Sequence, residues 1–353
     1  MTATQIHPYT LVFKRPAKTS RNTMTEKKCY VLTYGSPLKA IAECNVFEGL
    51  SADDRSDYLE TLKGACLKID RLFQLELPLE DERFNELLSS YLEFPSIQFG
   101  LEQLWFSFHS DDPFKLFSTP FSNGEKGIGI NGLVWMGDLA YMQAQIDRLL
   151  ENGFDCIKLK IGAHRFEDEY TLLKKLREKY PAEALELRVD ANGAYTPEKV
   201  QRVLERLASL KIHSIEQPIK AGQWDEMAQL CEYSPLPIAL DEELIGLFTD
   251  KEKQQCVSHI RPHYVILKPA LIGGFKACHA FIELNTPWWI TSALESNIGL
   301  NAIAQYTSTH ALVRPQGLGT GSLFVNNFSS PLSIEEARLC YNNEVPWNIN
   351  TII

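Results

Sequence analysis

The feature that most restricts the fold of this chain is a repeated alternation of short apolar runs and amphipathic segments after residue 127. Strand-like runs separated by helix-like periodicity are typical of parallel βα units. Seven or eight such units closing into a barrel are expected, although an open doubly wound sheet has the same local pattern. The expected strands cover residues 128–130, 156–161, 185–190, 214–216, 238–241, 264–267 and 289–291.

Amphipathic helices are expected between these strands. Thr196, followed by Pro197, is a typical helix start, because it combines a capping residue with proline in the first turn. The expected helices cover residues 138–152, 165–180, 196–210 and 223–232.

The first 110 residues have a different pattern. Strand-like stretches at 9–14, 29–34 and 40–44 are followed by helical periodicity at 54–73, 79–92 and 96–107. Strands followed by a block of helices predict an α+β domain, and a loop rich in Pro, Gly and Ser at 118–126 separates it from the βα repeat.

Three carboxylates stand at the ends of successive expected strands. Asp190 lies in LRVDANG, Glu216 in SIEQP and Asp241 in IALDEE. In a parallel barrel these ends meet at the C-terminal mouth, so we expect the three side chains to share one volume. Buried together they repel one another, and a hard dication relieves this repulsion. Oxygen ligands without Cys or His favour Mg²⁺ over Zn²⁺, so one Mg²⁺ is predicted, for which Mn²⁺ can substitute.

Lysines accompany the carboxylates. Lys158 and Lys160, in CIKLKIG, are two residues apart on one strand and so point to the same face, while Lys268 ends the sixth strand in VILKP. A partly desolvated lysine beside a metal can have its pKa lowered enough to act as a base. Removing a proton α to a carboxylate needs such a base and a metal that holds the enediolate oxygens. The set therefore predicts a proton-abstraction site.

The motifs KLK, DANG, EQP, DE and KP, in this order, resemble the muconate-lactonizing branch of the enolase superfamily. The resemblance implies a modified TIM barrel, (β/α)7β, over 111–321 and an N-terminal α+β capping domain over 1–110, with 322–353 packing on the capping domain. Segments 18–25 and 45–52 should close the site. By the same resemblance, Asp190, Glu216 and Asp241 bind the metal, Lys160 is the acid/base, Lys268 is the cation on the opposite face of the substrate, and Lys158 and Asn192 are supporting groups.

Within this branch, ITSALESNIGL at 290–300 resembles the o-succinylbenzoate synthase family. The motif contains Ser292 and Glu295, and the N-terminus of the following helix can receive a carboxylate. The later segment QGLGTGSLF, with Gly317, offers glycine amides and lacks the Asp-x-Asp signature of dipeptide epimerases. The resemblance implies Mg²⁺-dependent syn-dehydration of 2-succinyl-6-hydroxy-2,4-cyclohexadiene-1-carboxylate in menaquinone biosynthesis, with Lys160 acting in both steps.

Two alternatives remain at this level. One is an N-succinylamino acid racemase or another muconate-cycloisomerase-like enzyme of the same branch. The other is a non-catalytic ligand-binding barrel, which the complete set of lysines and carboxylates disfavours. The mandelate-racemase branch is disfavoured because the seventh strand ends in Thr291 and Ser292 and not in histidine.

Composition restricts the partners. Lys and Arg number 35 against 45 Asp and Glu, a net charge of −10, which disfavours nucleic acid and anionic membranes. No apolar stretch reaches the ~18 residues of a membrane span, and no secretory signal is evident. The eight cysteines are scattered and are expected to be reduced thiols. We therefore expect a cytoplasmic enzyme for a small carboxylate; nothing in the sequence indicates its oligomeric state.

Overall fold

An antiparallel sheet and a group of helices form the first part of the chain in the computed structural model, which describes residues 3–18 and 23–352. The capping sheet consists of β1 (Gln5–Lys18), β2 (Thr23–Tyr34) and β3 (Ala40–Cys44), in the order β1-β2-β3. Its helices are α1 (Tyr58–Gln74), α2 (Glu82–Ser89) and α3 (Pro95–Phe108). The expected α+β arrangement is confirmed, with longer β1 and β2 strands than the sequence indicated.

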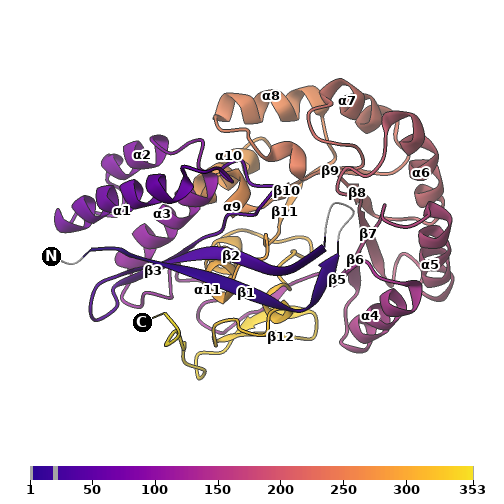
Figure 1. Cartoon of the computed structure of the whole chain (residues 1–353). Coiled ribbons are helices and arrows are strands. Elements are labelled where there is room, and N and C mark those ends of the chain that lie inside the picture. The colour runs from indigo at the N-terminus through magenta and orange to yellow at the C-terminus, as the bar shows by residue number, and fades with distance from the viewer. Residues whose placement is uncertain (1–2, 19–22, 353) are drawn as a thin grey trace.

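A parallel sheet follows and curls into a barrel (Figure 1). Neighbouring strands follow the order of the chain, and the sheet closes where Gln316 and Gly317 bridge Ile130 and Thr291. This closure excludes the open doubly wound sheet and confirms the modified (β/α)7β barrel. The strands are β5 (Gly132–Val134), β6 (Cys156–Lys160), β7 (Glu186–Asp190), β8 (Ser214–Glu216), β9 (Ile238–Leu240), β10 (Tyr264–Leu267) and β11 (Trp288–Ile290).

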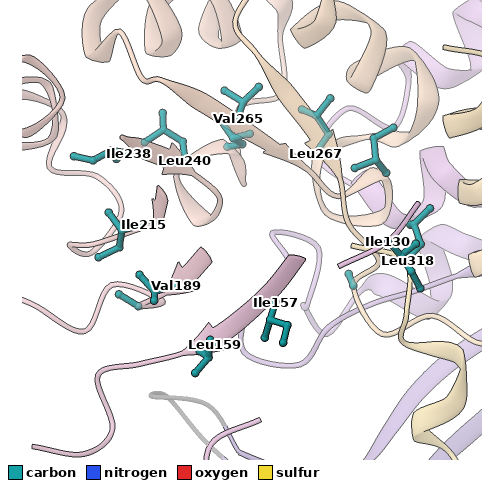
Figure 2. Close-up of a cluster of buried hydrophobic side chains, with 14 of the residues drawn as sticks. Ile130, Ile157, Leu159, Val189, Ile215, Ile238, Leu240, Val265, Leu267 and Leu318 are labelled. Atoms are coloured by element: carbon teal, nitrogen blue, oxygen red, sulfur yellow. The ribbon is translucent and has the colours of Figure 1, made fainter. Parts of the chain in front are cut away.

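Helices surround the barrel because alternate strand residues face outward. Leu159, Val189 and Ile215 belong to one buried cluster with helix residues such as Leu173 and Leu204. Figure 2 shows the strand side chains of this cluster around the ring of strands. The helices are α4 (Leu139–Glu151), α5 (Phe166–Lys179), α6 (Pro197–Ser209), α7 (Trp224–Tyr233), α8 (Asp250–Ile260), α9 (Pro269–Ile272), α10 (Gly274–Ile282) and α11 (Asn297–Ser308), with 3-10 turns η1 (Glu242–Leu244) and η2 (Gly321–Leu323).

The first expected barrel strand, 128–130, is only partly correct, because Ile130 takes part in the barrel closure and residues 128–129 do not. β4 (Ile128–Gly129) pairs antiparallel with β13 (Arg338–Tyr341), and the first barrel strand is β5. Both short runs contain apolar residues, so local pattern does not show which of them joins the barrel. Pairing decides it, and the partner of β4 lies more than 200 residues away in β13.

The C-terminal residues contact both parts of the molecule. β12 (Leu332–Glu335) and β13 form a sheet with β4 beside the barrel, whereas Phe328 and Ile349 pack with Val31 and Ile41 of the capping sheet. The division at residues 110 and 321 stays a prediction. Across residues 3–18 and 23–352, no helix has the length and apolar character needed to span a bilayer. All eight cysteines lie in this part of the chain and are free thiols, as expected.

A buried carboxylate on α3 joins the capping helices to the barrel. Glu102 is 3% exposed and accepts hydrogen bonds from the backbone amides of Phe275 and Lys276, at the start of α10. Burial raises the pKa of Glu102 to about 8, although the two amides oppose this shift. In the folded state Glu102 therefore holds its proton well above the ordinary range of a glutamate.

This shift predicts a pH dependence of stability. Because the folded pKa is the higher one, the contribution of Glu102 is fully present below about pH 4.5 and is lost as the pH rises through about 8. Glu102→Gln cannot ionise, so its stability relative to wild type should rise by up to about 4–5 kcal/mol over that range. Urea unfolding of both proteins at several pH values measures the difference. A difference that does not change with pH would contradict the assigned shift.

Candidate active site

The three carboxylates predicted from the sequence meet at the C-terminal mouth of the barrel. Asp190 ends β7, Glu216 ends β8 and Asp241 directly follows β9, and these strands are neighbours. All three are at most 2% exposed, and each offers one oxygen that lies within 4.8 Å of the oxygens of the other two. This cluster is called the carboxylate trio below, and it could hold a metal ion.

The three lysines lie against the trio. Lys158 Nζ donates to Glu216 Oε2 at 2.7 Å and lies 3.5 Å from Asp190 Oδ2. Lys160 Nζ donates to Asp190 Oδ2 at 2.8 Å, and Lys268 Nζ donates to Asp241 Oδ2 at 2.5 Å. Lys160 ends β6 and Lys268 follows β10, so the two ammonium groups flank the trio from strands on either side of it.

Asn192, predicted as a supporting group, orients Lys160. Its Oδ1 accepts from Lys160 Nζ at 3.0 Å, and its Nδ2 donates to Glu242 Oε1 at 2.9 Å. Asn192 has φ +47°, a left-handed conformation that asparagine tolerates better than most residues. The DANG motif therefore places a backbone turn and an oriented amide beside Lys160. The ring of Trp135 lies on another side, with its centroid 5.8 Å from Lys160 Nζ.

The charged side chains of the site strongly shift one another's pKa values. Burial alone raises the pKa of Asp190, but the ammonium groups of Lys160, Lys158 and Lys268 outweigh it and hold this pKa far below the usual range. The pKa of Glu216 is raised, first by burial and then by the carboxylates of Asp190 and Asp241, against the effect of Lys158. The pKa values of these two neighbouring carboxylates are thus shifted in opposite directions.

Burial and the nearby carboxylates act in opposite directions on the pKa values of Lys158 and Lys268. Burial lowers the pKa of Lys158, but Glu216 and Asp190 outweigh it, and the net pKa is raised. The pKa of Lys268 is likewise raised, because Asp241 outweighs burial. A dication bound to the trio would offset these carboxylates and so oppose the rise in the pKa of both lysines.

The trio fits a hard dication by its chemistry. Glu216 Oε1 is buried and has no hydrogen-bond partner among the described residues. A buried carboxylate oxygen without a donor is costly, and it can be satisfied by a cation shared with the other two acids. An all-oxygen donor set suits Mg²⁺ or Mn²⁺.

A cavity opens beside the trio between the barrel mouth and the capping sheet. Of the predicted site residues, Lys158, Lys160, Asp190, Asn192, Lys268, Ser292 and Gly317 line it. The segments expected to close the site contribute Met24, Phe47 and Leu50, although residues 19–22 of segment 18–25 lie outside the described residues. Other wall residues were not predicted: Asn131, Leu133, Trp135, Leu271, Thr291, Ala293, Leu294, Gly319 and Thr320.

Sequence reasoning missed these residues for identifiable reasons. Asn131 and Trp135 flank β5, the strand that was assigned too early in the chain. The Thr291 hydroxyl is buried and has no hydrogen-bond partner within the described residues, although its position at the end of the seventh expected strand was a usable signal. Thr320 lies within the glycine-rich segment QGLGTGSLF, from which only the glycine amides were considered.

For three predicted groups the structure gives a partner or a place other than the cavity, and their roles in substrate binding stay predictions. The N-terminus of α11 does receive a carboxylate, but it is that of Glu43 on β3, which accepts from the amides of Ser296 and Gly299 at 3.0 Å. The amide of Gly317 donates to Ile290 O at 2.8 Å within the barrel ladder and not into the cavity. Glu295 is 0% exposed and lies behind the cavity wall. In each case residues from another strand or from the capping sheet already provide the hydrogen-bond partner of the group.

Glycine at position 317 is nevertheless needed. A Cβ at this position would lie 2.4 Å from Thr291 Oγ1. Because any larger residue would displace the wall at Thr291, Gly317 contributes space to the cavity and not a hydrogen bond.

Known proteins are similar to this chain in sequence and in fold. Residues 141–338 match the family described as Enolase C-terminal domain-like. The chain is 41% identical to o-succinylbenzoate synthase of Desulfotalea psychrophila, over 92% of this chain and 95% of that protein. The crystal structure of MenC from the same organism superposes with a TM-score of 0.83 at 37% identity, covering 96% and 99% of the two chains.

A relative with a different activity matches over a shorter range. N-succinylamino acid racemase of Thermus thermophilus is 34% identical over 44% of this chain and 40% of its own length. The match along almost the whole chain and the agreement of the structures carry the assignment. The chain belongs to the enolase superfamily and, within it, to the o-succinylbenzoate synthase family of lyases.

Proposed function

We propose that this enzyme removes water from 2-succinyl-6-hydroxy-2,4-cyclohexadiene-1-carboxylate to form o-succinylbenzoate in menaquinone biosynthesis. The observation that carries the proposal is the placement of Lys160 and Lys268 on either side of a buried carboxylate trio beside a cavity. The substrate is inferred from the similarity to the Desulfotalea psychrophila synthase.

In this proposal Asp190, Glu216 and Asp241 hold one Mg²⁺, and the free Oε1 of Glu216 supports this role. When bound, Mg²⁺ supplies positive charge next to the substrate carboxylate, which becomes more negative as the α-proton leaves. Lys158 remains paired with Glu216 and keeps this ligand oriented.

Lys160, as the free amine, removes the α-proton, and the electron pair moves toward the carboxylate. The ammonium of Lys268, on the other side of the trio, stabilises this charge. The electron pair then returns and expels the hydroxyl from the neighbouring carbon. Lys160 gives the same proton to the departing hydroxyl on the same face, so water leaves and the ring becomes aromatic. Asn192 holds Lys160 for both transfers.

A second candidate is N-succinylamino acid racemisation. Racemisation needs one acid/base group on each face of the reacting carbon, and Lys160 and Lys268 satisfy this requirement. The Thermus thermophilus relative is named for this reaction. The two functions therefore share one site and differ in substrate.

A two-substrate assay separates the candidates. With Mg²⁺ present, we expect kcat/KM for dehydration of the cyclohexadiene to exceed that for racemisation of N-succinyl amino acids by at least about tenfold, or about 1.4 kcal/mol. Absorbance and polarimetry follow the two reactions on one enzyme preparation. Faster racemisation than dehydration would overturn the proposed substrate.

A further inference from the structure

A second group of buried polar side chains lies where the capping sheet meets the loop after β11. Lys27 on β2 is 6% exposed, and Asn45 after β3 and Glu295 are both 0% exposed. The Lys27 ammonium donates to Asn45 Oδ1. Asn45 Nδ2 donates to Glu295 Oε1 at 2.8 Å and to Ala293 O at 3.0 Å. A continuous series of hydrogen bonds therefore links the capping sheet to this loop.

The partners determine how the Asn45 amide is oriented. An ammonium only donates, so it must face the amide oxygen, and the carbonyl of Ala293 only accepts, so it must face the amide nitrogen. Glu295 must then accept hydrogen bonds on both sides. Its Oε1 faces Asn45, while its Oε2 accepts from Ser292 Oγ at 2.5 Å and Ala293 N at 2.7 Å. A carboxylate meets both demands, whereas a carboxamide meets only one.

Ser292 and Thr320 continue the series to the cavity wall. Ser292 Oγ gives its hydrogen to Glu295 and accepts from Leu294 N at 3.1 Å and from Thr320 Oγ1 at 2.7 Å. All hydrogen-bonding capacity of the Ser292 hydroxyl is thereby used. Because the Thr320 hydrogen is used as well, Thr320 presents only acceptor lone pairs to the cavity.

The loop held by this series is strained. Leu294 has φ +67°, a left-handed conformation that is unfavourable for a residue with a Cβ. Such a conformation persists only where its surroundings hold it. Leu294 is 6% exposed and packs with Leu11 of the capping sheet and Trp135 of the barrel, and its amide is tied to Ser292.

We propose that Asn45 is a positioning residue. Lys27 fixes the orientation of the Asn45 amide, and this amide fixes the position of Glu295. Glu295 in turn holds Ser292, Leu294 and Thr320 in the arrangement that binds substrate. A substrate hydroxyl or amide N–H suits the acceptor presented by Thr320, and a carboxylate does not. This inference rests on the proposed function in using its substrate, and it adds a specificity element outside the trio and the lysines.

Reciprocal substitution tests the proposal. Asn45→Asp keeps the hydrogen bond from Lys27 but places a carboxylate oxygen next to the carboxylate of Glu295. Glu295→Gln leaves only one acceptor oxygen, so it can no longer accept on both sides. Each single variant is expected to raise KM about tenfold, with kcat within about threefold of wild type. In the double variant the new amide at position 295 can donate to the new carboxylate at position 45, so this pair matches again, while the Ala293 carbonyl still lacks its donor. Its KM should therefore fall below that of both single variants without returning fully to the wild-type value.

KM is measured with whichever of the two substrates of the assay above the wild-type enzyme uses faster. A preference for N-succinyl amino acids therefore contradicts the proposed function while the role of Asn45 is still tested. Glu102→Gln is the matched control, because it makes the same acid-to-amide change between capping helices and barrel but away from the cavity wall. It should alter stability and leave KM unchanged.

Two outcomes would overturn the proposal. Unchanged KM in both single variants, with a lower melting temperature, assigns Asn45 and Glu295 a purely structural role. A double variant no better than the worse single variant means that the two side chains do not act through their mutual hydrogen bond. If Asn45→Asp does not fold, Asn45→Ser, which removes the bond to Glu295 without adding charge, takes its place and should raise KM similarly.

Discussion

Lys160→Ala is expected to reduce turnover by at least about 1,000-fold while leaving Mg²⁺ binding intact. Lys160 Nζ lies 2.8 Å from Asp190 Oδ2 and 3.0 Å from Asn192 Oδ1, so its removal takes away the amine that is placed for proton transfer. The trio itself keeps all its oxygens. Steady-state dehydration gives kcat, and calorimetric titration with MgCl₂ gives the metal affinity.

Lys174→Ala is the control for this variant. Lys174 is a helix lysine with a 56% exposed side chain, and its pairing with Glu178 at 3.8 Å is weak. It should retain wild-type kcat. Substantial turnover by Lys160→Ala, with metal binding unchanged, would remove Lys160 from the mechanism and reopen the assignment of the acid/base.

Glu216→Gln is expected to abolish metal-dependent stabilisation and, with it, activity. For a ligand at 100 times its Kd, the free energy of unfolding rises by about 2.7 kcal/mol, and wild type should show this with Mg²⁺. The variant loses the charge at the centre of the trio and the unpartnered Oε1, so no increase is expected. Thermal unfolding with MgCl₂ and with EDTA measures both proteins, and kcat should fall by at least about 1,000-fold.

Glu178→Gln serves as the matched control, since Glu178 has a 63% exposed side chain on α5. This variant should respond to Mg²⁺ as wild type does. Retained Mg²⁺ stabilisation in Glu216→Gln would contradict the assignment of the trio as the metal site.

Much of the barrel was predictable because its signals are local. The strands at 214–216 and 264–267 were expected with the bounds that β8 and β10 have, since short apolar runs between amphipathic helices leave few alternatives. The convergence of the three acids followed from parallel strand direction alone.

Short strands with distant partners were not predictable in the same way. β4 and β5 are 2 and 3 residues long, and their sequences do not distinguish pairing with β13 from pairing with β6. The direction of the lysine pKa shifts also depended on distances to carboxylates, which periodicity does not contain.

The charged residues at the mouth of the barrel were determined by the sequence itself, since each of Asp190, Glu216, Asp241 and Lys160 ends or directly follows a strand. Only the tertiary structure decided which carboxylate occupies the N-terminus of α11 and what holds the cavity wall. Glu43 meets Ser296 across 253 residues, and Asn45 meets Glu295 across 250. Such contacts carry no local signal, because they form only when the capping sheet packs on the closed barrel and buries polar groups that must then find one another as partners.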